Sequence, residues 1–297
     1  MTNKRFIFKI MPINQLPQRE EYLKKKRNRK IIKWSLLTAL FLVIAIGLSY
    51  ASYRPKLRIS KVVLSGGILV TQEDVWEKSL SFLKGSYFWI APHDNAFIYP
   101  RKALEKHLKE SFKRIDTIDM HREDFNTIVV TITERKPVAT WCNRLPGQVS
   151  VSLKSPNDYL QCYFIDQNST IFAEAPYFSG DAYFKYYGLV STSTPIGTYY
   201  IASSTLFDEI SEFIERTKQM SIRPIYLIAK DNGEFSLVIE GGGEIYFDLK
   251  EPLSKTTSNL EALLRTPALS TSTSSILPIQ YIDLRFSNKL FYKLKGE

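Results

Sequence analysis

Three histidines and two cysteines are the residues best suited to catalysis or metal binding, and their spacing forms no recognisable site. The surrounding sequence places His93 in a loop, His107 on a helix and His121 on a strand. Metal sites need converging ligands and usually show a local spacing such as H-E-x-x-H or Cys-x-x-Cys. Neither occurs, and neither a Walker loop nor a G-x-S-x-G turn occurs. We therefore expect no catalytic residue, no metal site, no cofactor and no small-molecule substrate.

The two cysteines, Cys142 and Cys162, lie in segments that look like paired strands, 138–142 and 159–166. A disulfide between them would close a loop of 19 residues. In the chain-entropy treatment such a loop contributes about 3 kcal/mol, and it would form outside the cytoplasm. The alternative is a pair of small, buried hydrophobic side chains, and the sequence leaves both interpretations open.

Positive charge is concentrated at the N-terminus, although the whole chain carries a net charge of +10. Residues 1–33 contain 11 lysines and arginines against two glutamates, whereas the other 264 residues contain 29 basic and 28 acidic residues. A nearly neutral remainder argues against a nucleic-acid-binding domain. The basic tail is explained by attraction to anionic lipid of the cytoplasmic membrane, and the alternative is a cytoplasmic partner site.

An apolar segment from Trp34 to Tyr53 contains 20 residues without a charge. About 20 such residues are needed to cross the hydrocarbon layer as a helix. Because the basic residues lie mostly before the segment, we expect the N-terminus in the cytoplasm and the bulk of the chain outside it. A cleaved signal peptide is the alternative, but its usual apolar run is shorter.

The following residues, 54–136, show the order strand, helix, helix, strand, strand. The expected segments are 59–64, 71–85, 100–112, 115–121 and 127–133. Thr71 with Asp74 is a helix-start signal, and the last strand is β-branched almost throughout.

Residues 137–297 show mostly strands. The expected strands are 138–142, 159–166, 225–230, 234–240, 244–249, 279–286 and 289–294, and the expected helices are 203–220, capped by Thr205 with Asp208, and 252–265. Glycine-containing turns join neighbouring strands as hairpins. The sequence thus predicts an α+β protein: an N-terminal transmembrane helix, a β-α-α-β-β domain, and a mixed α/β domain built on a mainly antiparallel sheet.

Four features occur in order along the chain: the basic tail, anchor and β-α-α-β-β unit; Thr131–Trp141 (TITERKPVATW); Tyr163–Asp166 (YFID); and Tyr281–Phe286 (YIDLRF). Together they resemble the FtsQ/DivIB family of bacterial division proteins. In that family the first unit is a POTRA domain, E-R-x-P-V-A-x-W joins it to a β domain, and Y-I-D-L-R-F is the terminal strand. The family usually has Gly after the I-D piece, where this chain has Asn168-Ser169.

The resemblance implies a basic cytoplasmic tail (1–33), a transmembrane helix (34–53), a POTRA-like domain (54–136) and a C-terminal β domain with two helices and a terminal partner-binding strand (137–297). It implies a scaffold at the division septum, without enzymatic activity. Such a scaffold binds FtsB- and FtsL-like single-pass proteins outside the cytoplasmic membrane and links them to septal peptidoglycan synthesis.

The resemblance also places the partner site on the last strands. Its candidate residues are Tyr281, Asp283, Arg285, Phe286, Asn288, Lys289 and Phe291. If this region is an exposed edge, a partner could add a strand to it. Arg285 would then hold a partner carboxylate at two points, and Phe286 and Phe291 would supply apolar contact.

If 279–286 is one strand, its side chains alternate between two faces. Ile282, Leu284 and Phe286 would share one face, and Tyr281, Asp283 and Arg285 the other. The simpler interpretation is a core strand with an Asp283–Arg285 pair at the surface.

Other functional classes keep the anchor but change the outer part. A membrane-anchored extracytoplasmic cell-wall enzyme would need a cleft with a nucleophile or paired carboxylates. A sensor or adhesion ectodomain would signal through the basic tail. A POTRA-bearing transport component would need a membrane barrel with strands of about 9–11 residues, and the strands expected here are mostly shorter.

Overall fold

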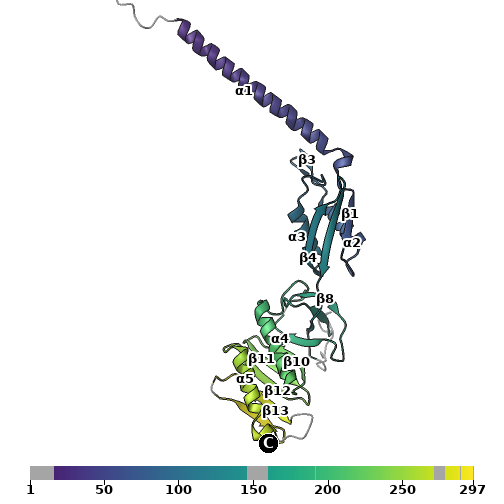
Figure 1. Cartoon of the computed structure of the whole chain (residues 1–297), viewed down its shortest axis with the longest axis vertical. Coiled ribbons are helices and arrows are strands. Elements are labelled where there is room, and N and C mark those ends of the chain that lie inside the picture. The colour runs from purple at the N-terminus through teal and green to yellow at the C-terminus, as the bar shows by residue number, and fades with distance from the viewer. Residues whose placement is uncertain (1–16, 146–159, 191, 271–277, 288, 297) are drawn as a thin grey trace, which may run out of the picture. The chain divides into compact units, whose positions relative to one another are not determined.

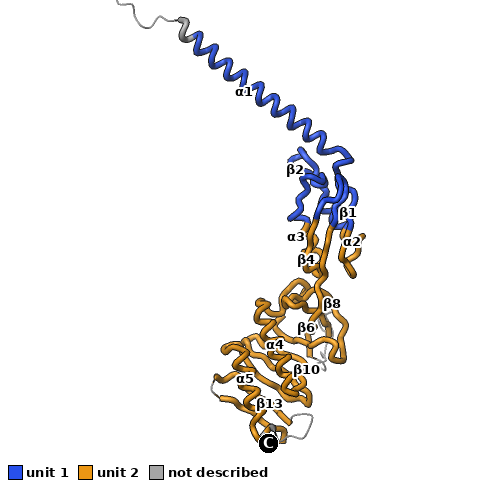
Figure 2. The backbone as a smooth tube through the Cα atoms, in the orientation of Figure 1, with its two compact units in different colours: residues 1–63, 76–104, 121–129 blue, residues 64–75, 105–120, 130–297 orange. Residues whose placement is uncertain are grey.

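The structure, a computed structural model, describes residues 17–145, 160–190, 192–270, 278–287 and 289–296. Helices and strands are mixed along the chain, so the expected α+β class is confirmed (Figure 1). The chain forms two compact units (Figure 2). Unit 1 consists of residues 1–63, 76–104 and 121–129, and unit 2 of residues 64–75, 105–120 and 130–297. The domain boundaries drawn from the sequence stay predictions.

One described helix, α1 (Pro17–Ser52), is long and apolar enough to cross a membrane. Its most apolar part has a mean hydropathy of 2.3 and is not buried by the rest of the described chain. The helix begins before Trp34, the first residue of the expected span, because the basic residues that precede it are also good helix formers. This agrees with a single-pass anchor, while its orientation stays a prediction.

After α1, the helices and strands up to residue 134 follow the expected order, with a small hairpin inserted between the two helices. The elements are η1 (Pro55–Leu57), β1 (Lys61–Ser65), α2 (Gln72–Phe82), β2 (Ser86–Tyr87), β3 (Ala91–Pro92), α3 (Arg101–Ser111), β4 (Ile115–Arg122) and β5 (Thr127–Glu134). Three of them form a sheet in the order β1-β5-β4. Thr71 caps α2 as expected, since its Oγ1 accepts from the Asp74 N–H at 3.2 Å.

The remaining strands form one nine-stranded sheet in the order β14-β13-β12-β11-β10-β9-β6-β7-β8. The strands are β6 (Ala139–Cys142), β7 (Cys162–Ile165), β8 (Ile171–Ala175), β9 (Phe184–Gly188), β10 (Pro224–Ala229), β11 (Glu234–Ile239), β12 (Glu244–Asp248), β13 (Ile279–Asp283) and β14 (Phe291–Leu294). Five neighbouring pairs are antiparallel and three, β6–β9, β9–β10 and β12–β13, are parallel. The expectation of a mainly antiparallel sheet is confirmed.

The sheet packs one face against α4 (Ser204–Gln219) and α5 (Leu253–Leu264), which precedes the short α6 (Pro267–Ser270). The Phe213 ring of α4 lies 4.7 Å from that of Phe247 in β12. The cap expected from Thr205 and Asp208 is wrong, because Ser203 Oγ accepts from the Leu206 N–H instead.

Two strands of this sheet, β8 and β9, were not expected from the sequence. They belong to the region between 166 and 203, where their short apolar runs are interrupted by polar residues. Parallel pairing to β6 and β10 gives β9 its place in the sheet, and such long-range pairing leaves no local signal.

Glu134, in the segment that resembles the family's junction, caps a loop. Its Oε1 accepts hydrogen bonds from the N–H groups of Ile68, Leu69 and Val70 at 2.8–2.9 Å. Burial raises the pKa of this carboxyl, but the three backbone hydrogen bonds outweigh burial and leave the pKa below its ordinary value. The carboxylate therefore helps to hold the loop between β1 and α2.

The neighbouring Arg135 connects three segments of unit 2. Its Nε donates to the Lys113 carbonyl at 3.1 Å, its Nη1 lies 3.3 Å from Asp116 Oδ1, and it also donates to Asp166. Asp166 is buried, and its other oxygen accepts from the Asn168 and Thr170 N–H groups. Two segments that carry the family resemblance, 131–141 and 163–166, thus meet in one ion-pair network.

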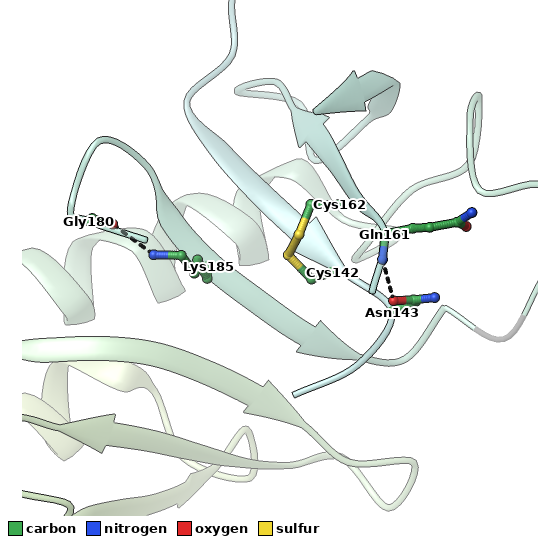
Figure 3. Close-up of a disulfide and its surroundings, with 6 residues drawn as sticks. All are labelled: Cys142, Asn143, Gln161, Cys162, Gly180 and Lys185. Carbon is green, nitrogen blue, oxygen red and sulfur yellow. Dashed lines mark hydrogen bonds between the residues drawn. A yellow bond between two sulfur atoms is a disulfide. The ribbon is translucent and has the colours of Figure 1, made fainter. Parts of the chain in front are cut away.

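The disulfide interpretation of Cys142 and Cys162 agrees with the structure, in which the two residues are bonded (Figure 3). They face each other in the antiparallel β6–β7 pair. Just beyond them the Gln161 N–H donates to Asn143 Oδ1 at 2.9 Å, and this hydrogen bond continues the pairing toward the loop. The bond joins neighbours that the sheet already brings together.

Replacement of Glu134 should destabilise the protein in a pH-dependent way. Glu134→Gln should lower the free energy of unfolding at pH 7 by about 1–2 kcal/mol, as hydrogen bonds to a charged group are lost. Because the folded pKa is lowered, this contribution is present above the unfolded pKa of about 4.3 and disappears as the pH falls through the folded value. Denaturant unfolding of both proteins at pH 7 and pH 3 measures it, and a difference independent of pH would contradict the charged role.

The disulfide should make stability depend on reductant. Reduction should lower the free energy of unfolding by about 3 kcal/mol, the chain-entropy value for a loop of this length. The matched control is a Cys142→Ala/Cys162→Ala variant, whose unfolding should not respond to reductant. Thiol titration of the unfolded, unreduced chain should find no thiol. Two titratable thiols, or unfolding that ignores reductant, would contradict the bond.

Candidate partner-binding surface

The predicted partner strand is not the edge of the sheet. β13 ends at Asp283 and pairs with β12 on one side and β14 on the other, so among the described strands β14 is the edge. The expectation that 279–286 forms one exposed edge strand is therefore wrong. The chain turns after residue 286 and returns as β14, which covers the edge that β13 would otherwise offer.

Arg285 already holds carboxylates of its own chain. Its Nε and Nη2 donate to the two oxygens of Asp283 at 2.9 and 2.5 Å, and its Nη1 lies 2.9 Å from Glu234 Oε2. The expected two-point contact is thus made within the protein. It holds the turn after β13 against β11.

The charges of this cluster are stabilised by one another. Burial raises the pKa of Asp283, but hydrogen bonds from Arg285 outweigh it and keep the pKa below its ordinary value. Hydrogen bonding to Asp283 raises the pKa of Arg285. The interpretation as a core strand with an Asp283–Arg285 pair is confirmed, since β13 lies between β12 and β14 and the pair forms, but Asp283 is buried and not at the surface. A buried carboxylate needs such a charged partner.

Alternation of side chains ends after Leu284. Ile282 and Leu284 are buried on the helix-covered face as expected, whereas Phe286 is 48% exposed. Its ring packs edge-on against Phe291 at 5.3 Å, and Phe291 pairs opposite Asp283 in the sheet. Phe286 therefore lies with the Asp283 side of the sheet, contrary to the alternation expected for a strand reaching residue 286.

Aromatic side chains gather on this second face, next to the edge strand. The Tyr281 ring lies 6.2 Å from the ring of Tyr246, which belongs to the neighbouring strand β12. The Arg285 guanidinium lies 5.4 Å from the Tyr246 ring centre. We call Tyr246, Tyr281, Phe286 and Phe291 the terminal aromatic surface, a mixture of half-buried and exposed rings of the kind enriched at interfaces.

Two further residues, Asn288 and Lys289, were predicted for the partner site. Lys289 is exposed beside β14, and Asn288 lies outside the described residues. Sequence reasoning missed Tyr246 and Glu234, which contact the terminal strands from β12 and β11. Alternation with Ile245 and Phe247 could have placed Tyr246 on the outward face, but not beside Tyr281. The contact between Tyr246 and Tyr281 depends on the parallel pairing of β12 with β13, two strands that are separated in the sequence by α5.

Among the described residues, no group of three or more His, Cys, Asp or Glu side chains could hold a metal ion. A groove of about 400 Å³ lies between α4 and α5, lined by residues that include Glu212, Arg216 and Glu261. Glu212 is paired with Arg216, and Glu261 with Arg265, as neighbours along their helices. These pairs are ordinary helix-surface contacts.

No family model matches the chain, and no curated protein matches it.

Removal of Arg285 should destabilise the C-terminal sheet. Arg285→Ala leaves Asp283 buried without its charged partner, and we expect a loss of about 2–3 kcal/mol. The matched control is Arg265→Ala, which breaks an exposed pair within one helix and should cost less than about 0.5 kcal/mol. Denaturant unfolding measures both. Equal effects of the two substitutions would contradict a structural role for the Arg285 cluster.

Proposed function

We propose that this protein is a single-pass membrane scaffold of bacterial cell division, without enzymatic activity of its own. It sits at the septum with its N-terminus in the cytoplasm and binds FtsB- and FtsL-like single-pass proteins outside the cytoplasmic membrane. Residues 54–136 act as a POTRA-like domain, and the assembly regulates septal peptidoglycan synthesis. The observation that carries the proposal is the terminal aromatic surface beside the edge strand β14, in the region that resembles the family's terminal strand.

An edge strand is a natural docking place for an extended peptide. Among the described strands β14 is the outermost of the sheet, and an added strand along it would gain affinity from main-chain hydrogen bonds. The exposed ring of Phe291 on β14, and the exposed ring of Phe286 packed against it, supply side-chain selectivity. In this proposal the partner strand lies along β14, not along 279–286.

The resemblance gains support from residues outside this surface. Glu134 and Arg135 of the junction segment both have structural roles, and Arg135 binds Asp166 of the second segment. Ser169, near the position where the family usually has Gly, has a φ of 64°, a conformation that favours glycine. A residue other than glycine therefore occupies this positive-φ position.

The partner surface is better tested at its phenylalanines than at Arg285. Arg285→Glu would place a third carboxylate beside Asp283 and Glu234, so lost binding could reflect local unfolding. Phe286 and Phe291 are about half exposed and contact each other, so their removal should leave the sheet intact.

Phe286→Ala and Phe291→Ala should weaken partner binding. We expect each to raise Kd by about 5- to 30-fold, corresponding to about 1–2 kcal/mol for an aromatic contact residue. The measurement is titration of the full chain in lipid nanodiscs with soluble extracytoplasmic segments of FtsB- and FtsL-like proteins. Tyr199→Ala is the matched control, since Tyr199 is exposed but bridges to Thr170 near the opposite edge of the sheet.

The outcomes separate the parts of the proposal. Binding weakened by both phenylalanine variants and not by Tyr199→Ala supports the division scaffold and this surface. If none of the three substitutions affects binding, the scaffold role stands and the partner site lies elsewhere on the protein. No binding by the folded wild-type chain would contradict the proposed function.

A further inference from the structure

The hairpin formed by β2 and β3 exposes its largest apolar side chains at its tip. Phe88 is 88% exposed, Trp89 is 89% exposed and the following Ile90 is 57% exposed. The Ile90 N–H donates to the Tyr87 carbonyl at 2.8 Å. This hydrogen bond closes a tight turn that has Phe88 and Trp89 at its tip. Three adjacent exposed apolar residues usually mark a surface that another phase or molecule covers.

The backbone of this turn is costly for the residues that occupy it. Phe88 and Trp89 have φ values of 47° and 60°. Two successive positive-φ residues, as in a type I′ hairpin turn, favour Asn and Gly, and bulky side chains rarely adopt this conformation. An unfavourable conformation that displays two exposed aromatic rings points to a functional constraint on the tip.

Hydrogen bonds attach the tip to the last turn of α1 and to the residue that follows the helix, all within unit 1. The Ser49 hydroxyl donates to the Ile90 carbonyl at 2.6 Å, and the Tyr53 hydroxyl donates to the Trp89 carbonyl at 3.1 Å. Ser49 lies in the last turn of α1 and Tyr53 directly follows the helix, so both contacts lie at the same end of the apolar span.

The base of the hairpin is fixed to the same segment. Asn95 Nδ2 donates to both the carbonyl and the hydroxyl of Ser52 at 3.0 Å. Arg58 holds Asp94 at two points, with Nε–Oδ1 at 3.0 Å and Nη2–Oδ2 at 2.6 Å. With both tip and base bonded to residues 49–58, the position of the hairpin relative to the end of α1 is set.

The geometry points to a membrane-docking role for this hairpin: Phe88, Trp89 and Ile90 enter the outer-leaflet boundary between headgroups and acyl chains when α1 spans the bilayer. A span of about 20 residues covers about 30 Å, so Trp34 and Tyr53 mark its two ends. The tip is bonded one turn inside the outer end, within the roughly 5–10 Å depth at which interfacial apolar groups lie. Aromatic residues are enriched at this level of a membrane.

The surrounding charges suit the same surface. Arg54 and Lys56 follow the span directly and are exposed, so they can meet lipid phosphates while the rings enter the apolar layer. The Arg54 guanidinium also lies over the Tyr50 ring at 4.7 Å, which adds an aromatic side chain to the same belt. The hairpin therefore acts as a second membrane contact that limits the swing of the outer part about the end of α1. This inference rests on the proposed membrane anchoring by α1.

Tryptophan quenching by brominated lipid tests it on the full chain. The protein is reconstituted in phosphatidylcholine–phosphatidylglycerol vesicles with or without bromine near the upper end of the acyl chains. The four tryptophans include Trp34, at the inner end of the span, and Trp89, at the hairpin tip. Trp89→Phe should reduce the quenched emission by about half, similarly to Trp34→Phe, as expected for two interfacial indoles.

Trp76→Phe is the matched control, because it removes a solvent-exposed indole from α2 and should leave the quenched emission unchanged. Loss of quenching in Trp34→Phe but not in Trp89→Phe would overturn the hairpin contact and keep the membrane span. Absence of quenching in the wild type would overturn both the span and the hairpin contact. Near-ultraviolet circular dichroism checks that each variant is folded.

Discussion

The Arg135 ion-pair network is the interaction on which the second unit most depends. Asp166 is buried, and a buried carboxylate is tolerated only with a charged partner and satisfied oxygens. Arg135 supplies the charge, while the Asn168 and Thr170 N–H groups satisfy the remaining oxygen. That carboxylate orders the turn from β7 to β8, and the same guanidinium reaches Asp116 on β4. One side chain thereby joins the β7–β8 turn to β4 within this unit.

The same principle recurs at the other end of the sheet, with a different consequence. Asp283 is buried and needs Arg285, which in turn draws Glu234 to the cluster. Because Arg285 is paired with carboxylates of its own chain, the proposed partner surface consists of the exposed rings and the edge strand. The ion pairs hold the terminal turn in shape, and the proposed recognition uses the aromatic rings and the edge strand. An Asp-x-Arg sequence next to phenylalanine can therefore be structural and still lie beside the proposed binding surface.

In the proposed docking, the short β2–β3 hairpin gives the protein a second contact with the membrane. Its paired strands contain only two residues each, too few for independent stability. It is held instead by side chains from the end of α1 and by the Arg58–Asp94 pair. A single helix crossing a bilayer leaves the following segment free to tilt and rotate. The proposed contact of the hairpin, which is bonded to residues 49–58, restricts that freedom without requiring another span.

Sequence patterns alone determined the features that depend on neighbouring residues. These are the apolar helix, the β-α-α-β-β order, the glycine-containing hairpins and the mainly antiparallel character of the sheet. The tertiary structure decided features that depend on residues far apart in the chain. It placed β9 between β6 and β10, brought Tyr246 beside Tyr281, committed Arg285 to Asp283 and Glu234, and made β14 the edge. The physical reason is that periodicity and turn chemistry act over a few residues, whereas strand order is selected by burial of the whole core, which no local segment encodes.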